Sequence, residues 1–364
     1  KIKQLKLKNY RNYDFVQLEF DDVTNIFYGD NAQGKTNILE SIYLCGTTKS
    51  HRGTKDRDLI KFGQEESHIE AIIEKDNIPF QIDIHLKKNS PKGIAINKIP
   101  IKKASELFGI INIVFFSPED LNIIKNGPSE RRKFIDMELS QLDKVYLNDL
   151  SNYNRVVNQR NRLLKDIYDR KELIQNLDIW DIQLVNYGNK IIERRNIFIS
   201  QINKIVSSVH EKLTGGKEII HLYYEPSNGN LSLEDALLKN RERDIKMKST
   251  SVGPHRDDIC FMIDNLDIRK FGSQGQQRTA ALSLKLSEIE LVKQLINDTP
   301  ILLLDDVLSE LDKSRQNYLL DSICDVQTLI TCTGLDEFVN HRFSINKMIH
   351  VEQGSVYENV RPQN

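Results

Sequence analysis

Gly29-Asp30-Asn31-Ala32-Gln33-Gly34-Lys35-Thr36 has the pattern G-x-x-x-x-G-K-T, which is typical of a phosphate-binding P-loop. A strand-like run over 23–28 precedes it, and an apolar stripe predicts a helix over 37–45. The glycines let backbone N–H groups surround a phosphate, to which the helix presents its positive end. We expect Lys35 to reach the β- and γ-phosphates and the Thr36 hydroxyl to hold Mg²⁺. The alternative is a glycine-rich turn beside a core helix.

A buried strand that ends in two carboxylates is the second signal. Residues 301–304 are apolar, and Asp305 and Asp306 follow them. In an open α/β sheet, ligands bind beyond the carboxyl ends of the strands. We therefore expect Asp305 to hold Mg²⁺ opposite Thr36, and Asp306 to orient or deprotonate an attacking water. Without a P-loop in the chain, this pattern is often only an exposed strand end.

The third signal is Phe271-Gly272-Ser273-Gln274-Gly275-Gln276-Gln277-Arg278, followed by an apolar stripe that predicts a long helix over 281–295. Serine and glycine before a helix N-terminus can provide a second anion site. Taken alone, Ser273 is better interpreted as a helix N-cap. Its place after the P-loop and before the two carboxylates favours the anion-binding interpretation.

The composition changes after Ser117-Pro118, and residues 120–213 are predicted to be helical almost throughout. Two segments carry a seven-residue apolar pattern, which Arg160 and Arg194 interrupt. The apolar positions are Tyr146, Leu150, Tyr153, Val157, Leu164 and Ile167, then Leu177, Trp180, Leu184, Tyr187, Ile191 and Phe198. The pattern predicts either an antiparallel helical hairpin or two ordinary amphipathic helices packed on a core.

Shorter patterns predict further elements on both sides of this insertion. We expect strands within 1–28, with a turn near 9–13, and over 67–74, 79–86, 110–116 and 221–225. A polar turn is expected over 87–93, a helix over 231–243 and a tight hairpin at Asp264-Asn265. We also expect 309–312 to form the first turn of a helix and 353–364 to form a strand that fades into a tail.

The composition limits the possible partners and compartments. Among 364 residues, 51 Lys and Arg face 52 Asp and Glu, so a nucleic acid must meet a local basic face. Cys45, Cys260, Cys324 and Cys332 form no metal-binding or disulfide pattern, and we expect reduced packing residues in a cytoplasmic protein. No apolar run approaches membrane-spanning length, and the first residues do not resemble a signal peptide.

The order of these motifs resembles the ABC-type ATPase heads of the structural-maintenance-of-chromosomes class, and within it the bacterial RecF family. The resemblance runs nearly end to end. Besides the three motifs above, it is carried by Asn9-Tyr10-Arg11-Asn12-Tyr13, Asn37-Ile38-Leu39-Glu40, Lys49-Ser50-His51-Arg52, Phe116-Ser117-Pro118-Glu119-Asp120, Gly127-Pro128, Arg131-Arg132-Lys133-Phe134-Ile135-Asp136 and Gly253-Pro254-His255-Arg256-Asp257-Asp258.

The resemblance implies an α/β fold, namely an ABC-type P-loop ATPase head with an inserted helical, short coiled-coil-like lobe. We expect 1–119 and 250–364 to form the ATPase lobe and 120–249 to form the insertion. The implied activity is that of a weak DNA-dependent ATPase, which acts in recombinational repair of single-strand gaps and stalled forks. ATP would drive homodimerisation and DNA binding, slow hydrolysis would release the DNA, and RecR and RecO are implied partners.

The resemblance also implies a role for each motif residue. Lys35, Asp305 and Asp306 would be catalytic, and Thr36 and Asp305 would hold the metal. The residues implied to bind ATP are Gly29, Asp30, Asn31, Ala32, Gln33, Gly34, Lys35 and Thr36, with Ser273, Gly275 and Gln276 supplied by a second subunit. Asp306 stands where transporter relatives carry Glu, and only the Thr331 or Thr333 hydroxyl stands where they carry His. No residue matches the Gln that touches the metal in relatives.

The candidate DNA contacts are cationic side chains, because Lys and Arg supply most non-specific DNA affinity. They are Arg52, Lys125, Arg131, Arg132 and Lys133. Arg155, Arg160, Arg162 and Lys165 add positive charge along the insertion. Such charges are equally compatible with solvated helix faces, and Arg11 and Arg52 with surface ion pairs.

Three other functions compete with this one. A transporter ATPase subunit requires a short helical subdomain and the missing His. A monomeric P-loop kinase or hydrolase has no use for the 273–277 segment. An inactive interaction protein does not require intact Lys35, Thr36 and Asp305.

Overall fold

The computed structural model describes residues 1–296, 298–334 and 345–359, and the chain forms two compact units. The first comprises Lys1–Asp120 with Glu288–Asn364, and the second comprises Leu121–Ser287. The insertion predicted from the sequence ends at residue 249, whereas residues 250–287 also belong to the second unit of the structure. One reason is that β10 (Asp258–Ile263) pairs along its whole length with β9 (Ile220–Glu225).

An antiparallel sheet forms one layer of the first unit, with the strand order β2-β1-β4-β5-β6-β7. Its strands are β1 (Ile2–Tyr10), β2 (Tyr13–Glu19), β4 (Glu66–Lys75), β5 (Ile78–Lys87), β6 (Ser90–Ile96) and β7 (Ile99–Pro100). Along β4, the side chains of Ile69, Ala71 and Ile73 are buried, while the residues between them are at least partly exposed. This alternation is typical of a sheet with one buried face.

The strand β6 corrects the polar turn that was predicted over 87–93. Lys88 and Asn89 alone form the turn, and 90–93 are the first half of a strand. In the described sheet, β7 pairs with β6 only at Ala95 and Ile96, so the first half of β6 lies at an edge. Proline and glycine are tolerated at sheet edges, where a missing N–H or side chain costs little.

A second sheet of the first unit has the strand order β15-β14-β3-β13-β12-β8 and is parallel except for β15. Its strands are β3 (Thr24–Tyr28), β8 (Ile113–Phe116), β12 (Ile301–Asp305), β13 (Thr328–Cys332), β14 (Lys347–Glu352) and β15 (Ser355–Asn359). Every residue of β8, β12 and β13 is buried, as expected for strands covered on both faces. The sequence patterns did not indicate β14, and the predicted tail over 360–364 lies outside the described residues.

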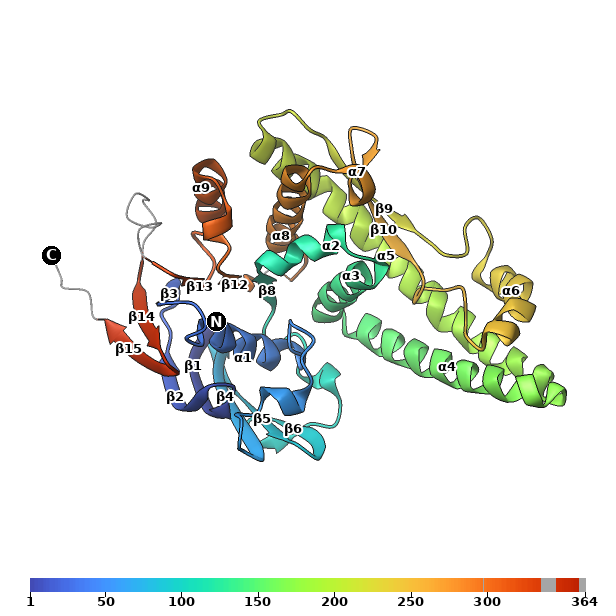
Figure 1. The fold of residues 1–364 in the computed structure, drawn as a ribbon, viewed down its shortest axis with the longest axis horizontal. Helices are drawn as coiled ribbons and strands as arrows, with labels where there is room; N and C mark the ends of the chain where they lie inside the picture. Colours follow the sequence, from blue (N-terminus) through green and yellow to red (C-terminus); the bar gives the residue numbers. More distant parts are fainter. Residues whose placement is uncertain (297, 335–344, 360–364) are drawn as a thin grey trace. The chain divides into compact units, whose positions relative to one another are not determined.

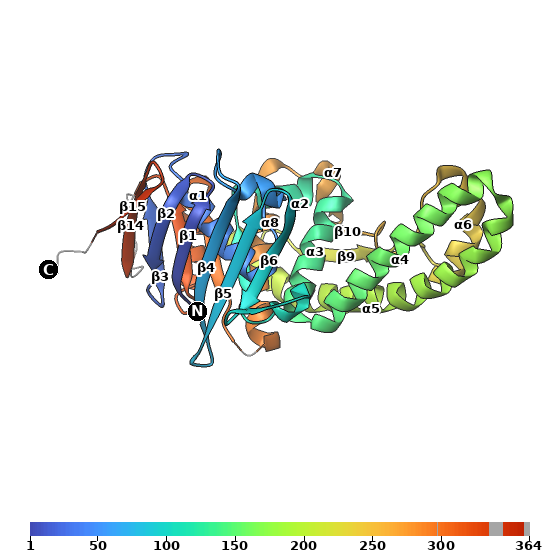
Figure 2. The ribbon, with the colours of Figure 1, turned by 90° about the horizontal axis from the view of Figure 1, so that it is seen from below.

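Helix α1 (Lys35–Thr47) contacts strands of both sheets of the first unit. It extends the helix predicted over 37–45, and all its residues from Ile38 onward are buried. A helix that is buried on all sides is typical of the interior of a layered fold. Figure 2 shows the antiparallel sheet with α1 behind its strands.

The segment after Asp306 differs from its prediction. Residues 309–312 were expected to form the first turn of a helix. Instead Leu308–Glu310 form a 3₁₀ turn, and α9 (Lys313–Ser322) begins after Asp312. The Asp312 side chain accepts the Arg315 N–H, which makes it the N-cap.

The second unit is mainly helical around a small antiparallel sheet with the order β11-β10-β9. Its elements are α2 (Leu121–Lys125), α3 (Pro128–Leu142), α4 (Lys144–Asp169), α5 (Leu177–Thr214), α6 (Leu233–Met247), β11 (Leu266–Asp267), α7 (Ile268–Phe271) and the start of α8 (Gln274–Ile296). Helices α4 and α5 form the predicted hairpin, and α6 packs on both of them (Figure 1). No helix among the described residues could cross a membrane.

Leu177, Leu184, Ile191 and Phe198 of α5 are buried, as the seven-residue pattern predicted, but the buried positions between them are shifted by one residue. Asp181, Gly188 and Arg195 are buried, whereas Trp180 and Tyr187 are partly exposed and Arg194 is exposed. The apolar pattern predicted that the large side chains at 180 and 187 would be buried. Ion pairs bury Asp181 and Arg195 instead, and close packing against a neighbouring helix buries Gly188. A Cβ on Gly188 would lie 2.5 Å from a Leu233 methyl group.

Arg160 explains how a cation occupies the interior of the hairpin. Its side chain is fully buried, Nε donates to Asp181 of α5 at 2.6 Å, and Nη1 donates to Asp244 of α6 at 2.7 Å. The two carboxylates offset the cost of burying one guanidinium, so the arrangement holds three helices together.

The cysteines are free, as expected, and three of them are buried. Cys324 is the exception to the prediction of packing residues, because its side chain is exposed.

We expect Arg160→Met to lower the free energy of unfolding by about 3–5 kcal/mol, because the buried Asp244 carboxylate loses its cation and Asp181 keeps only Arg241. Arg194→Met is the matched control. Its exposed ion pair with Asp143 should contribute only about 0–1 kcal/mol. Denaturant unfolding of both variants checks the prediction, which equal losses would contradict.

Candidate nucleotide-binding site

The P-loop has the backbone conformation that its glycines allow. Gly29, Ala32 and Gly34 have positive φ angles of 144°, 64° and 116°. A Cβ on Gly29 would lie 2.3 Å from the carbonyl oxygen of Val351 in β14. A Cβ on Gly34 would lie within 3 Å of the Asn12 and Tyr13 side chains. Both glycines are therefore required by close contacts as well as by backbone strain.

The turn between β1 and β2 holds the P-loop from the side. The Asn12 amide donates to the Gln33 carbonyl at 2.9 Å, and the Tyr13 hydroxyl donates to the Gly34 carbonyl at 3.0 Å. Asn37 of α1 in turn donates to the Asn12 side chain at 2.9 Å. No nucleotide-binding role was predicted for this turn. The signals that could have indicated one are its polar Asn-Tyr-Arg-Asn-Tyr run between two strands and the place of that run in the family resemblance.

Lys35 lies inside the loop that precedes it. Its side chain is buried, and Nζ donates to the carbonyls of Gly29 at 2.5 Å and Asp30 at 2.8 Å. Burial lowers the pKa of the Lys35 ammonium, while the Asp306 and Asp305 carboxylates act in the opposite direction. The predicted lysine, P-loop and carboxylates are thus gathered at one place in the first unit.

Thr36 and Asp305 meet as predicted. The Thr36 hydroxyl donates to Asp305 Oδ1 at 2.7 Å, and the Thr331 hydroxyl of β13 donates to the same oxygen at 2.8 Å. A hydroxyl and a carboxylate are the hard oxygen ligands that Mg²⁺ prefers, and Mg²⁺ takes its other ligands from water and phosphate. The pair therefore fits a magnesium site. Among the described residues, no group of three or more His, Cys, Asp or Glu side chains could hold a metal.

Asp306 is held in an unusual backbone conformation. Its φ angle is 53°, and its N–H lies 3.0 Å from the Thr331 hydroxyl and 3.3 Å from the Thr331 carbonyl. Left-handed conformations in residues other than glycine are concentrated at functional sites. Thr331 therefore contacts both carboxylate residues, whereas Thr333, the other candidate for the missing His, is exposed at the strand end.

Arg11 makes an internal ion pair. Its Nε and Nη2 each donate to Glu40 of α1 at 2.9 Å, and Glu40 is fully buried. Ser50 donates to the same carboxylate at 2.6 Å. Arg52 is exposed, and its charge partly opposes the rise in the Asp305 pKa that burial causes.

The Ser273 loop (residues 272–276) lies in the second unit at the start of α8. The Ser273 hydroxyl accepts the Gln276 N–H at 3.1 Å, and the Gln276 side chain accepts the Ser273 N–H at 3.0 Å. This reciprocal pair is a capping box. Gln276 also donates to Glu218 at 3.0 Å, so it has an internal role. Ser273 and Gly275 are exposed, and the Ser273 O–H remains available as a donor.

The candidate DNA contacts of the second unit divide into two kinds. Lys125 and Lys133 are exposed. Arg131 is buried, with an ion pair to Asp258, and Arg132 is partly buried and donates to the Asp257 carbonyl at 2.8 Å. Sequence patterns cannot distinguish an exposed cation from one that is neutralised inside the fold.

Comparisons with known proteins indicate the family and the fold. The model of the RecF/RecN/SMC N terminal domain family matches residues 1–356. A protein of Agathobacter rectalis, described as DNA replication and repair protein RecF, is 62% identical over 98% of both chains. A solved structure of the recombination mediator protein RecF with ATP, in the RecFOR pathway, is similar with a TM-score of 0.90 and 36% identity, covering 99% of this chain and 97% of the other.

A more distant solved structure supports the fold alone. The Smc head domain of Pyrococcus furiosus, bound to a domain of ScpA, has a TM-score of 0.57 and 17% identity, covering 98% of this chain and 95% of the other. The expected α/β fold of an ABC-type ATPase head with an inserted helical lobe is confirmed.

We expect Asp305→Asn to raise the melting temperature of the nucleotide-free protein by a few degrees at neutral pH. Burial raises the pKa of the Asp305 carboxyl above its usual value, and the bonds from Thr36 and Thr331 only partly oppose this. A group whose pKa is raised on folding stabilises the fold while protonated, and this contribution is lost as the pH rises through the raised pKa. Asparagine stays neutral and can still accept both hydroxyls.

The control for this prediction is Asp325→Asn. Its hydrogen bond to Lys293 lowers the pKa of the Asp325 carboxyl, so neutralising it should leave the melting temperature unchanged or lower. Thermal unfolding with ATP, with and without Mg²⁺, completes the test. Asp305→Asn should lose the magnesium-dependent part of the stabilisation. A variant that melts lower than the parent without nucleotide would contradict the prediction.

Proposed function

This chain belongs to the RecF family of DNA replication and repair proteins, and we propose that it is an ATP-dependent DNA-binding protein that acts at single-strand gaps and stalled replication forks. The observation that supports this best is the meeting of Thr36, Asp305 and Thr331 beside a P-loop with Lys35 inside it. A likeness to RecF bound to ATP supports ATP as the nucleotide. Membership of a family that includes SMC-like ATPases supports ATP hydrolysis by this chain.

In this proposal the P-loop residues bind the triphosphate. Lys35 exchanges its two carbonyl acceptors for phosphate oxygens, and the first N–H groups of α1, which have no partner in the helix, donate to the same group. Thr36 and Asp305 would hold Mg²⁺, which would offset negative charge on the phosphates. Asp306 orients the attacking water and accepts its proton. We infer slow hydrolysis that DNA stimulates.

We propose that the Ser273 loop completes the ATP site of a second copy of the chain. Gly275 supports this assignment. A Cβ there would meet nothing closer than the Ser273 hydroxyl at 3.9 Å, so packing within the chain does not require glycine. Glycine in a helix costs about 1 kcal/mol relative to alanine. Close approach of a ligand offers a reason for it.

DNA binding in this proposal depends on closure of the dimer, because the net charge of the chain is only -1. Exposed cations such as Lys125, Lys133 and Arg52 are the proposed phosphate contacts. ATP binds the closed state better than the open state and thereby favours it. We further propose RecR and RecO as partners, which the RecFOR pathway of the similar structure supports.

Lys35→Ala should abolish ATP binding, because it removes the cation enclosed by the P-loop. Equilibrium binding of a fluorescent ATP analogue measures this, and sizing with ATP and gapped DNA measures the consequences. The parent should shift from monomer to dimer with ATP and then bind the DNA. Normal ATP-dependent DNA binding by Lys35→Ala would refute the assignment.

Ser273→Arg should leave ATP binding by the monomer intact while preventing ATP-dependent dimerisation. Loss of the N-cap itself costs about 1 kcal/mol. Ser232→Arg is the matched control, because Ser232 is exposed and caps α6 by accepting the Asp235 N–H. Sedimentation with ATP should show a dimer for Ser232→Arg and a monomer for Ser273→Arg. Dimers of both variants would mean that the Ser273 loop is not at the interface.

A further inference from the structure

The Ser273 loop is connected to the small sheet by a very short helix. Helix α7 spans only Ile268–Phe271, and a helix this short is not stable by itself. Gln277 of α8 donates to the Ile268 carbonyl at 2.8 Å, and a Cβ on Gly272 would lie 2.7 Å from that same oxygen. The position of the loop therefore depends on what holds α7.

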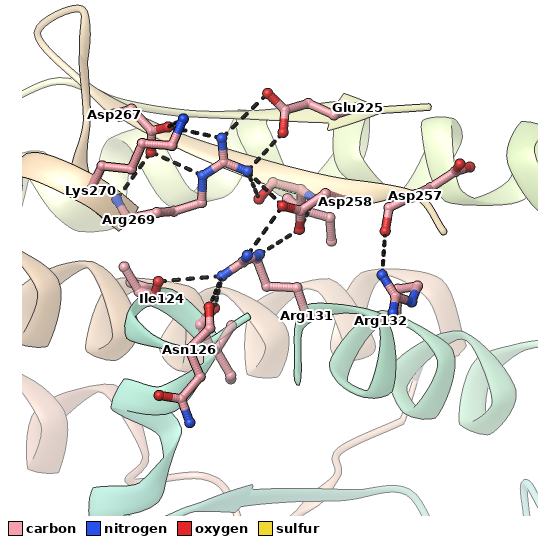
Figure 3. A network of polar contacts seen from close by, with 12 residues as sticks. Ile124, Asn126, Arg131, Arg132, Glu225, Asp257, Asp258, Asp267, Arg269 and Lys270 are labelled. Carbon is pink, nitrogen blue, oxygen red and sulfur yellow. Dashed lines mark hydrogen bonds and ion pairs between the residues drawn. The ribbon is translucent and has the colours of Figure 1, made fainter. Parts of the chain in front are cut away.

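Arg269 of α7 is the residue that anchors this helix (Figure 3). Its side chain is only 10% exposed. Nε and Nη2 each donate to Asp267 at 2.9 Å, and Nη1 donates to Glu225 at 2.7 Å and to Asp258 at 2.9 Å. One guanidinium thus joins β9, β10 and β11. Planar bidentate pairs of this kind fix orientation as well as charge.

Asp258 extends the connection to a second arginine. Arg131 of α3 donates to Asp258 Oδ1 at 2.5 Å through Nε and to Oδ2 at 3.1 Å through Nη2. The Asp258 carboxylate therefore lies between two guanidinium groups, as Figure 3 shows. Its own side chain is 19% exposed, so solvent screens these interactions only weakly.

Arg131 uses its remaining nitrogen to hold the end of α2. Nη1 donates to the carbonyls of Ile123 at 3.0 Å, Ile124 at 3.3 Å and Asn126 at 2.7 Å. Carbonyls at a helix C-terminus lack partners within the helix, and a cation there satisfies them. Since α2 is the first element of the second unit, the network joins the segment by which the chain enters this unit to the segment that starts α8.

We propose that Asp258, bridging Arg131 and Arg269, is a positioning element that fixes the Ser273 loop in the geometry used for the ATP site of a second copy. This inference rests on the proposed function. Neither arginine needs to contact nucleotide or DNA. They act through the backbone of α7, which leads directly into Gly272 and Ser273.

The chain offers a matched control for Asp258. Asp181 of α5 also accepts from two arginines, Arg160 and Arg241, and its side chain is 11% exposed. The partners of Asp181 lie on α4 and α6, and they do not include the elements that lead into the Ser273 loop. Asp258→Asn and Asp181→Asn therefore remove the same kind of bridge from the same unit, but only the first connects to α7.

The test compares the two variants by hydrogen–deuterium exchange of residues 270–278 in the nucleotide-free protein. Asp258→Asn should increase exchange in this segment at least tenfold, and Asp181→Asn should change it less than twofold. ATP-dependent self-association should weaken at least tenfold for Asp258→Asn only, while ATP binding by the monomer stays within twofold. Thermal unfolding of both variants reports the general loss of stability.

Unchanged exchange at 270–278 in Asp258→Asn, or equal effects of the two variants, would overturn the proposal. If Asp258→Asn does not fold, Glu225→Gln serves instead, because it weakens the Arg269 anchor from the more exposed side and should raise exchange in the same segment. A parent protein that never self-associates with ATP would refute the proposed dimer. The exchange measurement would still decide the role of Asp258.

Discussion

The hydrogen bonds to the Asp305 carboxylate are the interaction on which the first unit depends. Thr36 at the start of α1 and Thr331 at the end of β13 donate to one oxygen of a residue that ends β12. Three segments far apart in the chain therefore meet at one buried charge. Parallel strands end at the same edge of a sheet, so the chemistry gathers there. Burying the Asp305 carboxylate costs free energy, and a bound cation would offset that cost.

The P-loop conformation also depends on the sheet that carries no catalytic group. Asn12 of the β1–β2 turn and Tyr13 at the start of β2 donate to the carbonyls of Gln33 and Gly34, while β14 approaches Gly29 so closely that no side chain fits. The loop therefore needs support from both sheets as well as from its own glycines. This arrangement explains why a short motif is rigid enough to present N–H groups to a phosphate.

Buried arginines organise the second unit in a comparable way. Arg160 joins α4 to α5 and α6, and Arg269 joins the three strands of the small sheet to α7. Each guanidinium presents several N–H donors in a fixed plane, so it fixes the orientation of the helices and strands that it joins. Apolar packing alone would allow these elements to slide past one another. Removing one partner leaves a charge unpaired, which makes such networks sensitive to single substitutions.

The sequence alone determined the P-loop and the strand that delivers Asp305, because both depend on local spacing and periodicity. Periodicity also indicated two long helices in the insertion but left open whether they form a hairpin, and the fold class followed from the family resemblance. Only the tertiary structure decided that Asp181, Gly188 and Arg195 complete the buried face of α5, that Arg131 is an internal ion-pair partner, and that residues 90–93 form an edge strand. In each of these cases the outcome depends on a partner distant in sequence. A cation is stable inside a protein only when carboxylates or carbonyls meet it, and spacing along the chain does not reveal whether they do.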